Sequence, residues 1–245
     1  QDLKTMSEAV EVLRQFKGFS YFTEMSDIIN RLEDHVASAR MKTTPVIDFE
    51  KNESLKGLDY LDTIYHAIVN EHPIQLKYRS FKARSANSFI FYPYLLKEYR
   101  NRWFVYGVRG NGRILQNLAL DRIQSLEVLP QEHYIKNTFF DPNTFFDDLV
   151  GVTKNTGSVA EKVGFKVAAA EAPYIITKPI HRSQQVMERL ADGSVILEIE
   201  VVINHELERV FFGYAEGIQV LYPKTLVELM GRKLKKAAEQ YTHSK

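Results

Sequence analysis

Cationic and aromatic side chains alternate along one stretch of this sequence, in a pattern suited to binding phosphorylated ligands. Between Phe89 and Arg109, lysine and arginine residues are interleaved with tyrosine, tryptophan and phenylalanine residues. Arginine and lysine neutralise phosphates, and aromatic rings stack on nucleobases with little sequence preference. The combination therefore favours single-stranded nucleic acid or a nucleotide-like anion as the ligand.

Part of the same pattern also has a purely structural explanation. Alternation along a strand puts Phe104, Tyr106 and Val108 on one face and Trp103 and Val105 on the other. One of these sets must fill a core, so we expect about half of the aromatic residues to be buried. A second ambiguity concerns Arg122, which is either a ligand contact or only the ion-pair partner of the preceding Asp121.

The basic residues are concentrated in one segment, although the net charge of the 245-residue chain is only +1. Residues 74–129 carry ten Lys/Arg and three Asp/Glu, a net charge of +7. Residues 1–73 carry −5 and residues 130–245 carry −1. This asymmetry favours an anionic partner for the central segment. Solvated lysines and arginines that cluster without a partner are the alternative.

Motifs for catalysis and for metal or cofactor binding are missing. The seven histidines show no HExxH pattern, and there is no GxSxG elbow, phosphate loop or dinucleotide fingerprint. The glycines of Gly107–Gly112 lie between two predicted strands and indicate a hairpin, and Asp147 and Asp148 indicate a solvated helical turn. The chain has no cysteine, which excludes disulfides and thiol chemistry. We expect no enzymatic activity, no metal site and no cofactor.

Membrane and secretion signals are also missing from the sequence. The longest apolar run, Val195–Ile203, is interrupted by Glu198 and Glu200 and is far shorter than a membrane span. Residues Gln1–Val12 lack the basic and then apolar pattern of a signal peptide. We therefore expect a cytoplasmic protein that has no membrane partner.

The elements that must position the candidate residues change in period along the chain. An amphipathic helix is predicted over Leu58–Glu71, and Pro73 ends it. From Ile74 onwards the period becomes two, which predicts strands at Ile74–Ser80, Phe89–Tyr99, Arg102–Arg109, Arg113–Leu120 and Gln124–Leu129. Five short antiparallel strands at this spacing favour a small, strongly curved β-barrel.

The flanking regions give the rest of the domain organisation. Helices predicted at Thr5–Phe16 and Thr23–Ser38 make residues 1–57 a helical linker and dimer contact, with packing of their apolar faces within the same chain as the alternative. Residues 131–157 are predicted to be a linker of loops with a short helix that begins at Asp141-Pro142. Residues 158–245 show the order strand–helix–strand–strand–helix–strand and then a terminal helix, which predicts a ferredoxin-like domain.

Several of these segments resemble the WYL-domain family of bacterial transcription regulators. The stretch from Tyr92 to Gly107, followed by Leu118–Ile123, is similar to the characteristic region of that family. The naming triplet is Trp103-Phe104-Val105 in this chain, a departure at two of three positions. Three later segments resemble the extension domain that usually follows a WYL domain, namely Ile180–Gln184, Asn204–Leu207 and Val220–Pro223. The resemblance assigns residues 58–130 to the WYL domain and residues 158–245 to the extension.

The resemblance implies an α+β protein in which an Sm-like, SH3-type β-barrel senses a nucleic acid or a nucleotide-like anion. It also implies a homodimeric regulator that contacts DNA through an N-terminal winged helix-turn-helix. Residues 1–73 carry −5, and their predicted helices lack a basic recognition face. We therefore expect the winged helix-turn-helix to be absent from this chain. The chain is then either the sensing part of a longer regulator or a standalone protein that modulates another factor.

Six residues form the candidate ligand site. The resemblance points to Trp103 and Arg122, and strand geometry adds Tyr78, Arg100, Arg102 and Arg109. In this interpretation, ligand binding shifts the protein between two arrangements and so controls operator binding. The alternative is a protein-interaction or oligomerisation module that has no ligand of its own and meets an acidic protein.

Overall fold

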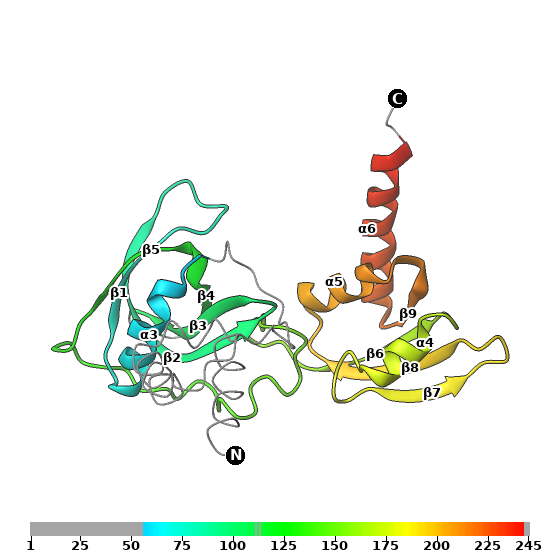
Figure 1. Ribbon diagram of the computed structural model, residues 1–245, viewed down its shortest axis with the longest axis horizontal. Helices are drawn as coiled ribbons and strands as arrows, with labels where there is room; N and C mark the ends of the chain where they lie inside the picture. Colours follow the sequence, from blue (N-terminus) through cyan, green and yellow to red (C-terminus); the bar gives the residue numbers. More distant parts are fainter. Residues whose placement is uncertain (1–55, 111, 113, 243–245) are drawn as a thin grey trace, which may run out of the picture. The chain divides into compact units, whose positions relative to one another are not determined.

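Figure 1 shows a computed structural model of the chain, which describes residues 56–110, 112 and 114–242. The predicted helices at Thr5–Phe16 and Thr23–Ser38 lie outside the described residues. The chain divides into two compact units, one that ends at Phe139 and one that begins at Phe140. Each unit contains its own antiparallel sheet and its own hydrophobic core.

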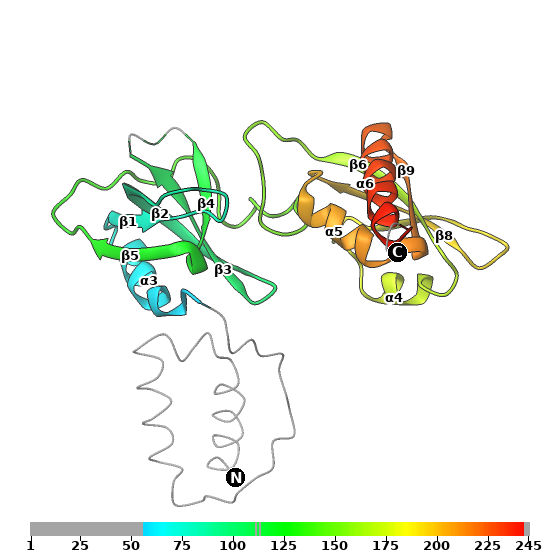
Figure 2. The ribbon, with the colours of Figure 1, turned by 90° about the horizontal axis from the view of Figure 1, so that it is seen from above.

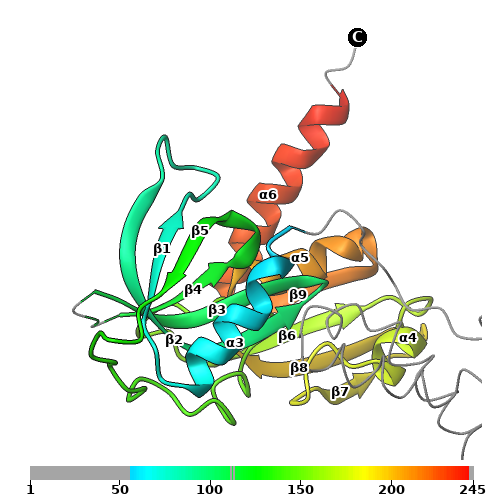
Figure 3. The same ribbon diagram turned by 60° about the vertical axis from the view of Figure 1, so that its left-hand side comes forward.

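The first unit begins with the predicted amphipathic helix. A 3-10 turn, η3 (Leu58–Tyr60), leads into α3 (Leu61–Val69). The helix buries Leu61, Ile64 and Ala67, which are spaced three apart and so lie on one face. Figures 2 and 3 show this helix lying against one side of the sheet that follows.

Five strands follow α3, as the period-two pattern predicted. They are β1 (Ile74–Tyr78), β2 (Asn87–Tyr99), β3 (Arg102–Arg109), β4 (Leu115–Ala119) and β5 (Ile123–Val128). Their order across the sheet is β4-β3-β2-β1-β5, so β4 and β5 are the two edges. No strand pairing within the described part of the chain joins these edges, and the prediction of a closed barrel is therefore wrong.

The sheet is open between its two edge strands, β4 and β5, which follow one another in the chain. They are joined by a second 3-10 turn, η4 (Leu120–Arg122). After this turn β5 pairs with β1, from Tyr78 opposite Ile123 to Ile74 opposite Val128, instead of returning along β4. Barrel closure depends on such long-range pairings, which strand periodicity does not specify.

The core of the first unit lies between α3 and one face of the sheet. Leu76, Phe91 and Val105 are fully buried there, and Trp103 packs against them. Tyr106 and Val108, on the opposite alternation of β3, are buried as well. The middle of β3 is thus buried on both faces, and of the aromatic residues between Phe89 and Arg109 only Phe91, Tyr94 and Tyr106 are buried.

The second unit follows the predicted order of elements. It contains β6 (Glu161–Val167), α4 (Ala172–Thr177), β7 (Gln185–Arg189), β8 (Val195–Val201), α5 (His205–Gly213), a 3-10 turn η5 (Ala215–Gly217), β9 (Ile218–Tyr222) and α6 (Lys224–Thr242). The strand order is β7-β8-β6-β9, and all three pairings are antiparallel. Phe165, Leu197 and Phe211 are among the fully buried residues of its core.

Two features of the second unit bear on function. The helix predicted at Asp141-Pro142 is not formed, because residues 142–148 make a series of turns instead. The Asp148 carbonyl then accepts a hydrogen bond from the Val202 amide at 2.8 Å, which ties this irregular segment to the end of β8. At the other end of the unit, α6 buries only Leu226 and Met230, and Figure 1 shows its later turns extending away from the sheet.

Candidate functional site

Two of the candidate arginines meet at one carboxylate. Asp121 lies in η4, and its side chain is only 11% exposed. Arg102 Nε is 3.2 Å from Asp121 Oδ2, and Arg122 Nε is 3.8 Å from Oδ1. The second distance is too long for a hydrogen bond, and neither Arg122 Nε nor Asp121 Oδ1 has a hydrogen-bond partner among the described residues. One carboxylate therefore faces two guanidinium groups, and the trio has a net charge of +1.

The strand register and a glycine place these three side chains together. Arg102 begins β3, and Phe104 two residues later pairs with Ala119, which immediately precedes η4. Gly57 has a φ of +84°, and a Cβ there would lie 2.4 Å from the Leu120 carbonyl carbon. Only glycine allows the chain before α3 to approach η4 so closely in this conformation.

Tyr78 connects this trio to the core. Its hydroxyl is hydrogen-bonded to the Arg122 side chain and to the backbone of Ala119. Burial raises the pKa of Tyr78, and the nearby Arg122 charge offsets only part of that increase. The phenol therefore stays neutral at physiological pH and holds Arg122 as a hydrogen-bond partner.

An aromatic residue that the sequence analysis did not select lies on Arg122. Phe81 is in the loop between β1 and β2, and the Arg122 guanidinium carbon is 4.6 Å from the centre of its ring. The Arg79 amide donates to the Arg122 carbonyl at 3.2 Å, which attaches the same loop to η4. The composition of this loop, with Arg79, Lys82 and Arg84 around Phe81, repeats the basic and aromatic pattern of β2 and β3. That composition was a signal that could have identified Phe81.

The remaining candidate residues lie elsewhere in the first unit. Arg100 is exposed in the turn between β2 and β3, with its guanidinium carbon 5.5 Å from the centre of the Tyr99 ring. Arg109 ends β3, about 24 Å from Arg102 at the rise of an extended strand, and covers the Phe89 ring at 4.1 Å. Trp103 packs against the core. The structure therefore brings Tyr78, Arg102 and Arg122 together, leaves Arg100 at the neighbouring turn and separates Arg109.

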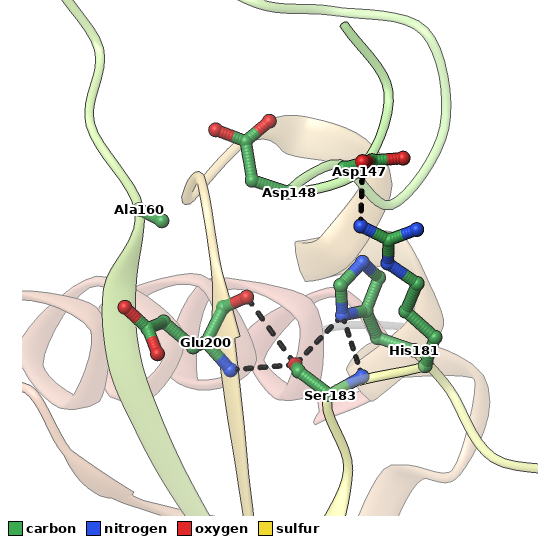
Figure 4. Close-up of a pocket in the computed structure, with 7 residues that line it drawn as sticks. Asp147, Asp148, Ala160, His181, Ser183 and Glu200 are labelled. Atoms are coloured by element: carbon green, nitrogen blue, oxygen red, sulfur yellow. Dashed lines mark hydrogen bonds and ion pairs between the residues drawn. The ribbon is translucent and has the colours of Figure 1, made fainter. Parts of the chain in front are cut away.

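A pocket of about 460 Å³ lies in the second unit (Figure 4). Asp147 and Asp148, which were expected on a solvated helical turn, form part of its wall. Arg182 contacts Asp147 at 2.7 Å, and Lys154 contacts Asp148 at 2.8 Å. The other lining residues are Ala160, His181, Ser183 and Glu200. Both aspartates are thus paired with a cation of the same unit.

His181 and Ser183 form a hydrogen-bonded pair inside this pocket. The imidazole Nδ1 is 2.7 Å from Ser183 Oγ, and the Glu200 amide donates to the same hydroxyl at 2.9 Å. His181 is also hydrogen-bonded to the Asp147 backbone, and burial lowers the pKa of its imidazole. The pair is bound on both sides by the backbone, so its evident role is to attach the loop before β7 to β8.

The described residues contain no group of three or more histidine, aspartate or glutamate side chains arranged to hold a metal ion. None of the helices formed by these residues has the length and apolar character needed to span a bilayer.

Comparison with known families and structures gives two domain matches. Residues 59–128 match the WYL domain, and residues 160–238 match the WCX domain. Among solved structures, the proteasome accessory factor B/C (PafBC) of Arthrobacter aurescens is 17% identical, with a TM-score of 0.35 over 85% of this chain and 31% of its own. A CRISPR Cas-related protein is 11% identical, with a TM-score of 0.46 over 76% of this chain and 52% of its own. This chain thus spans about a third of the length of PafBC and about half of the length of the CRISPR Cas-related protein. No curated protein matches this chain.

Proposed function

We propose from the following premise: this chain belongs to the WYL-domain family and carries a WYL domain followed by a WCX domain. We infer that it is the ligand-sensing part of a transcription regulator. Its ligand is a nucleic acid or a nucleotide-like anion, bound in the first unit by the cluster of Tyr78, Arg102 and Arg122. Ligand binding favours one arrangement of the regulator and so controls its binding to operator DNA. In this proposal the protein is cytoplasmic and has no enzymatic activity.

The sharing of one carboxylate by two arginines is the observation that carries the proposal. Arg102 and Arg122 both contact Asp121, so the pair retains one positive charge that Asp121 does not balance. Their side chains are 44% and 28% exposed, which leaves donor groups within reach of a ligand. A phosphate group accepts several guanidinium hydrogen bonds at once, and such charge-assisted bonds are about twice as strong as neutral ones.

Arg100, exposed in the neighbouring turn, is a further candidate phosphate contact. Arg100 and Asn101 have φ values of 50° and 61°, in the left-handed region. These values are the ones that a favoured two-residue hairpin turn requires at both of its central residues, so the proposal for Arg100 rests on its exposure and charge. Arg109 lies too far along β3 to touch the same nucleotide as Arg102, so it joins the site only if the ligand is a strand of several nucleotides.

A direct binding experiment tests the proposal. Fluorescence anisotropy is measured with a labelled strand of ten thymidines and with a labelled adenosine nucleotide, at several salt concentrations. Arg122→Ala is expected to weaken binding of the strand about 10- to 150-fold, because one charge-assisted contact is worth about 1.5–3 kcal/mol. The slope of log affinity against log salt is expected to fall by about 0.7 for the phosphate contact that is lost.

The matched control is Arg182→Ala, which removes an arginine paired with Asp147 in the second unit. It is expected to leave both the affinity and the salt slope unchanged, and circular dichroism verifies that each variant is folded. Equal binding by wild type and Arg122→Ala would remove Arg122 from the site. Binding of neither probe at low salt would contradict the sensing function itself.

One observation favours the alternative function, a protein-interaction module. The last turns of α6, from Gly231 to Thr242, are exposed. Leu234, Ala237 and Tyr241 recur there at the three-four spacing of a helix-pairing stripe, one turn beyond the buried Met230. In the sensing function this stripe supports the homodimer that we expect. In the alternative, binding another protein through this stripe is the main function. A purified, salt-washed chain that associates but shows no excess absorbance at 260 nm from retained nucleic acid would favour the alternative.

The finer fold assignments also belong to this proposal. We assign the open five-stranded sheet of the first unit to the Sm-like, SH3-type folds, because a 3-10 turn links its two edge strands. We assign the second unit to the ferredoxin-like folds, because its strand–helix–strand–strand–helix–strand order is combined with the antiparallel sheet order β7-β8-β6-β9.

A further inference from the structure

We infer that Phe81 is a nucleobase-binding residue, on whose exposed ring an unpaired base stacks while Arg122 supports the ring. This inference rests on the proposed function and narrows its ligand class. The ligand must carry a base whose face is accessible, as in single-stranded nucleic acid or a free nucleotide. Duplexes, in which neighbouring bases cover each face, and anions without a base are excluded as preferred ligands.

The exposure of Phe81 is the first observation. Its side chain is 72% exposed, and among the described residues it is the only phenylalanine on the exposed surface. Burying a phenylalanine side chain removes apolar surface from water and so stabilises a protein. A ring this exposed contributes little of that stabilisation, so packing does not explain its position.

The support beneath the ring is the second observation. The Arg122 guanidinium carbon is 4.6 Å from the ring centre, which is within the range of a cation–π contact. Arg122 is itself held by Tyr78 and faces Asp121, and the Arg79 amide attaches the Phe81 loop to the Arg122 carbonyl. The ring is thus held at one point while most of its surface remains in water. Such preorganisation lowers the ordering cost of stacking a base.

The charges around the ring are the third observation. Lys82 and Arg84 follow Phe81 in the same loop, are exposed, and take part in no ion pair with other residues that the structure describes. Arg122, which contacts the ring, also faces Asp121, the ion-pair partner of Arg102. A base stacked on Phe81 therefore has cations near it for its own phosphate. Stacking platforms next to cationic grooves are the arrangement with which proteins bind single strands.

The test compares Phe81→Leu with Phe81→Trp, using the labelled strand of ten thymidines as the probe. Base–aromatic stacking is worth about 1–3 kcal/mol per base, so Phe81→Leu is expected to weaken binding about 5- to 150-fold. Phe81→Trp is expected to keep wild-type affinity or exceed it, because the indole offers a larger stacking face. Its new tryptophan fluorescence is expected to be quenched when the strand binds, beyond any change seen in wild type, whose only tryptophan is Trp103.

Competitors identify the ligand class. Unlabelled single strand is expected to displace the probe from the wild type at least tenfold better than a duplex of equal length, and Phe81→Leu is expected to reduce that preference. Tripolyphosphate, which has no base, is expected to bind both proteins equally. Displacement by adenosine mononucleotide at concentrations similar to those of the strand would identify a free nucleotide as the ligand, and much weaker displacement would identify a strand.

The outcomes separate this inference from the proposed function. If Phe81→Leu binds the strand as well as the wild type while Arg122→Ala does not, the anion site stands and the nucleobase assignment is wrong. An equal preference of the wild type for duplex and single strand would also overturn the assignment. If the wild type binds none of the probes, the proposed function fails as well.

Discussion

The two units of this protein both gather charged side chains in irregular segments, but they balance these charges differently. In the first unit, Arg102 and Arg122 share the carboxylate of Asp121. In the second, Arg182 is paired with Asp147 and Lys154 with Asp148. A cluster of charges is therefore a candidate binding site when one sign is in excess, and part of the framework when each charge has its partner.

The segment that holds each cluster explains the difference. In the second unit, the turns at residues 142–148 replace the predicted helix, and tertiary contacts bind them in place. The Val202 amide donates to Asp148, and the Asn204 side chain donates to the carbonyls of Val150 and Thr153 at 3.0 Å each. The ion pairs of Asp147 and Asp148 belong to the same network. In the first unit, η4 is a short turn between two strands, and its charges are not needed to attach a long irregular segment.

The largest effect is expected when the shared carboxylate is neutralised. Asp121→Asn leaves Arg102 and Arg122 facing one another without an anion, in a site where the carboxylate is largely buried. We expect the free energy of unfolding to fall by about 2 kcal/mol, because removing one partner of a buried pair leaves the other charges uncompensated. The affinity for the ten-thymidine strand is expected to rise several-fold, since the site gains a positive charge. Urea unfolding followed by Trp103 fluorescence and binding anisotropy measure the two effects.

The matched variant in the second unit is Asp147→Asn. Arg182 and Asp147 are both substantially exposed, so the loss of their pair is expected to cost at most about 1 kcal/mol. Affinity for the strand is expected to stay at the wild-type value. The comparison between the units breaks down if Asp121→Asn lowers the affinity, because Asp121 would then orient the arginines for the ligand instead of competing with it.

A smaller effect is expected at the turn between β2 and β3. Arg100→Gly removes a side chain from a left-handed position, and glycine adopts that conformation without strain. We expect the first unit to become more stable by about 0.5–1 kcal/mol, since relief of the strain exceeds the entropy that glycine adds to the unfolded chain. Binding of the strand is expected to weaken two- to fivefold, because one phosphate contact is lost.

The control for this variant is Gly193→Ala, in the hairpin between β7 and β8 of the second unit, where φ is +83°. There the change runs from glycine to alanine, so stability is expected to fall while binding is unchanged. If Arg100→Gly instead lowers the free energy of unfolding, the arginine side chain stabilises the hairpin by more than the strain of its left-handed backbone destabilises it.

The sequence predicted the local elements well because their signals are local. The period of two placed β3 at Arg102–Arg109 with the observed bounds, and the strands and helices of the second unit appear in the predicted order. Barrel closure was predicted incorrectly because it requires β5 to pair with both β1 and β4, and among the described strands only the pairing with β1 forms. The helix at Asp141 was predicted incorrectly because the segment forms turns whose end, at Asp148, is held by a tertiary hydrogen bond from the Val202 amide, which the local sequence does not reveal.

The candidate site was predictable only in part, for a similar reason. Tyr78, Arg102 and Arg122 lie on three different elements, and the sequence identified all three by residue type without showing that they meet at Asp121. Phe81 was missed because a loop residue has no periodicity to mark it. Arg109 was grouped with Arg102 because both belong to β3, although the length of the strand separates them.

The smallest effect is expected from a change of pH. It should alter the stability through His181 of the second unit and leave the charge cluster of the first unit unchanged. Burial lowers the pKa of His181, and the charge of Arg182 acts in the same direction, whereas the Asp147 backbone and the charges of Asp148 and Asp147 oppose the shift. The unfolded chain therefore takes up this proton at a higher pH than the folded protein does. Below the ordinary histidine pKa of about 6.5, the unfolded state holds more protons, so the free energy of unfolding falls as the pH falls.

This loss of stability is expected below about pH 6.5, and its slope for one proton is at most about 1.4 kcal/mol per pH unit. His181→Gln is expected to flatten the slope, while His133→Gln, at an exposed position of the first unit, is expected to leave it unchanged. Urea unfolding followed by circular dichroism from pH 7.5 to 5.5 measures it. The cluster of the first unit contains no histidine, and burial raises the pKa of Tyr78 above this range. The affinity for the ten-thymidine strand is therefore expected to stay constant over the same pH range in both the wild type and His181→Gln. An affinity that changes with pH in the wild type but not in His181→Gln would show that the two charge clusters are coupled.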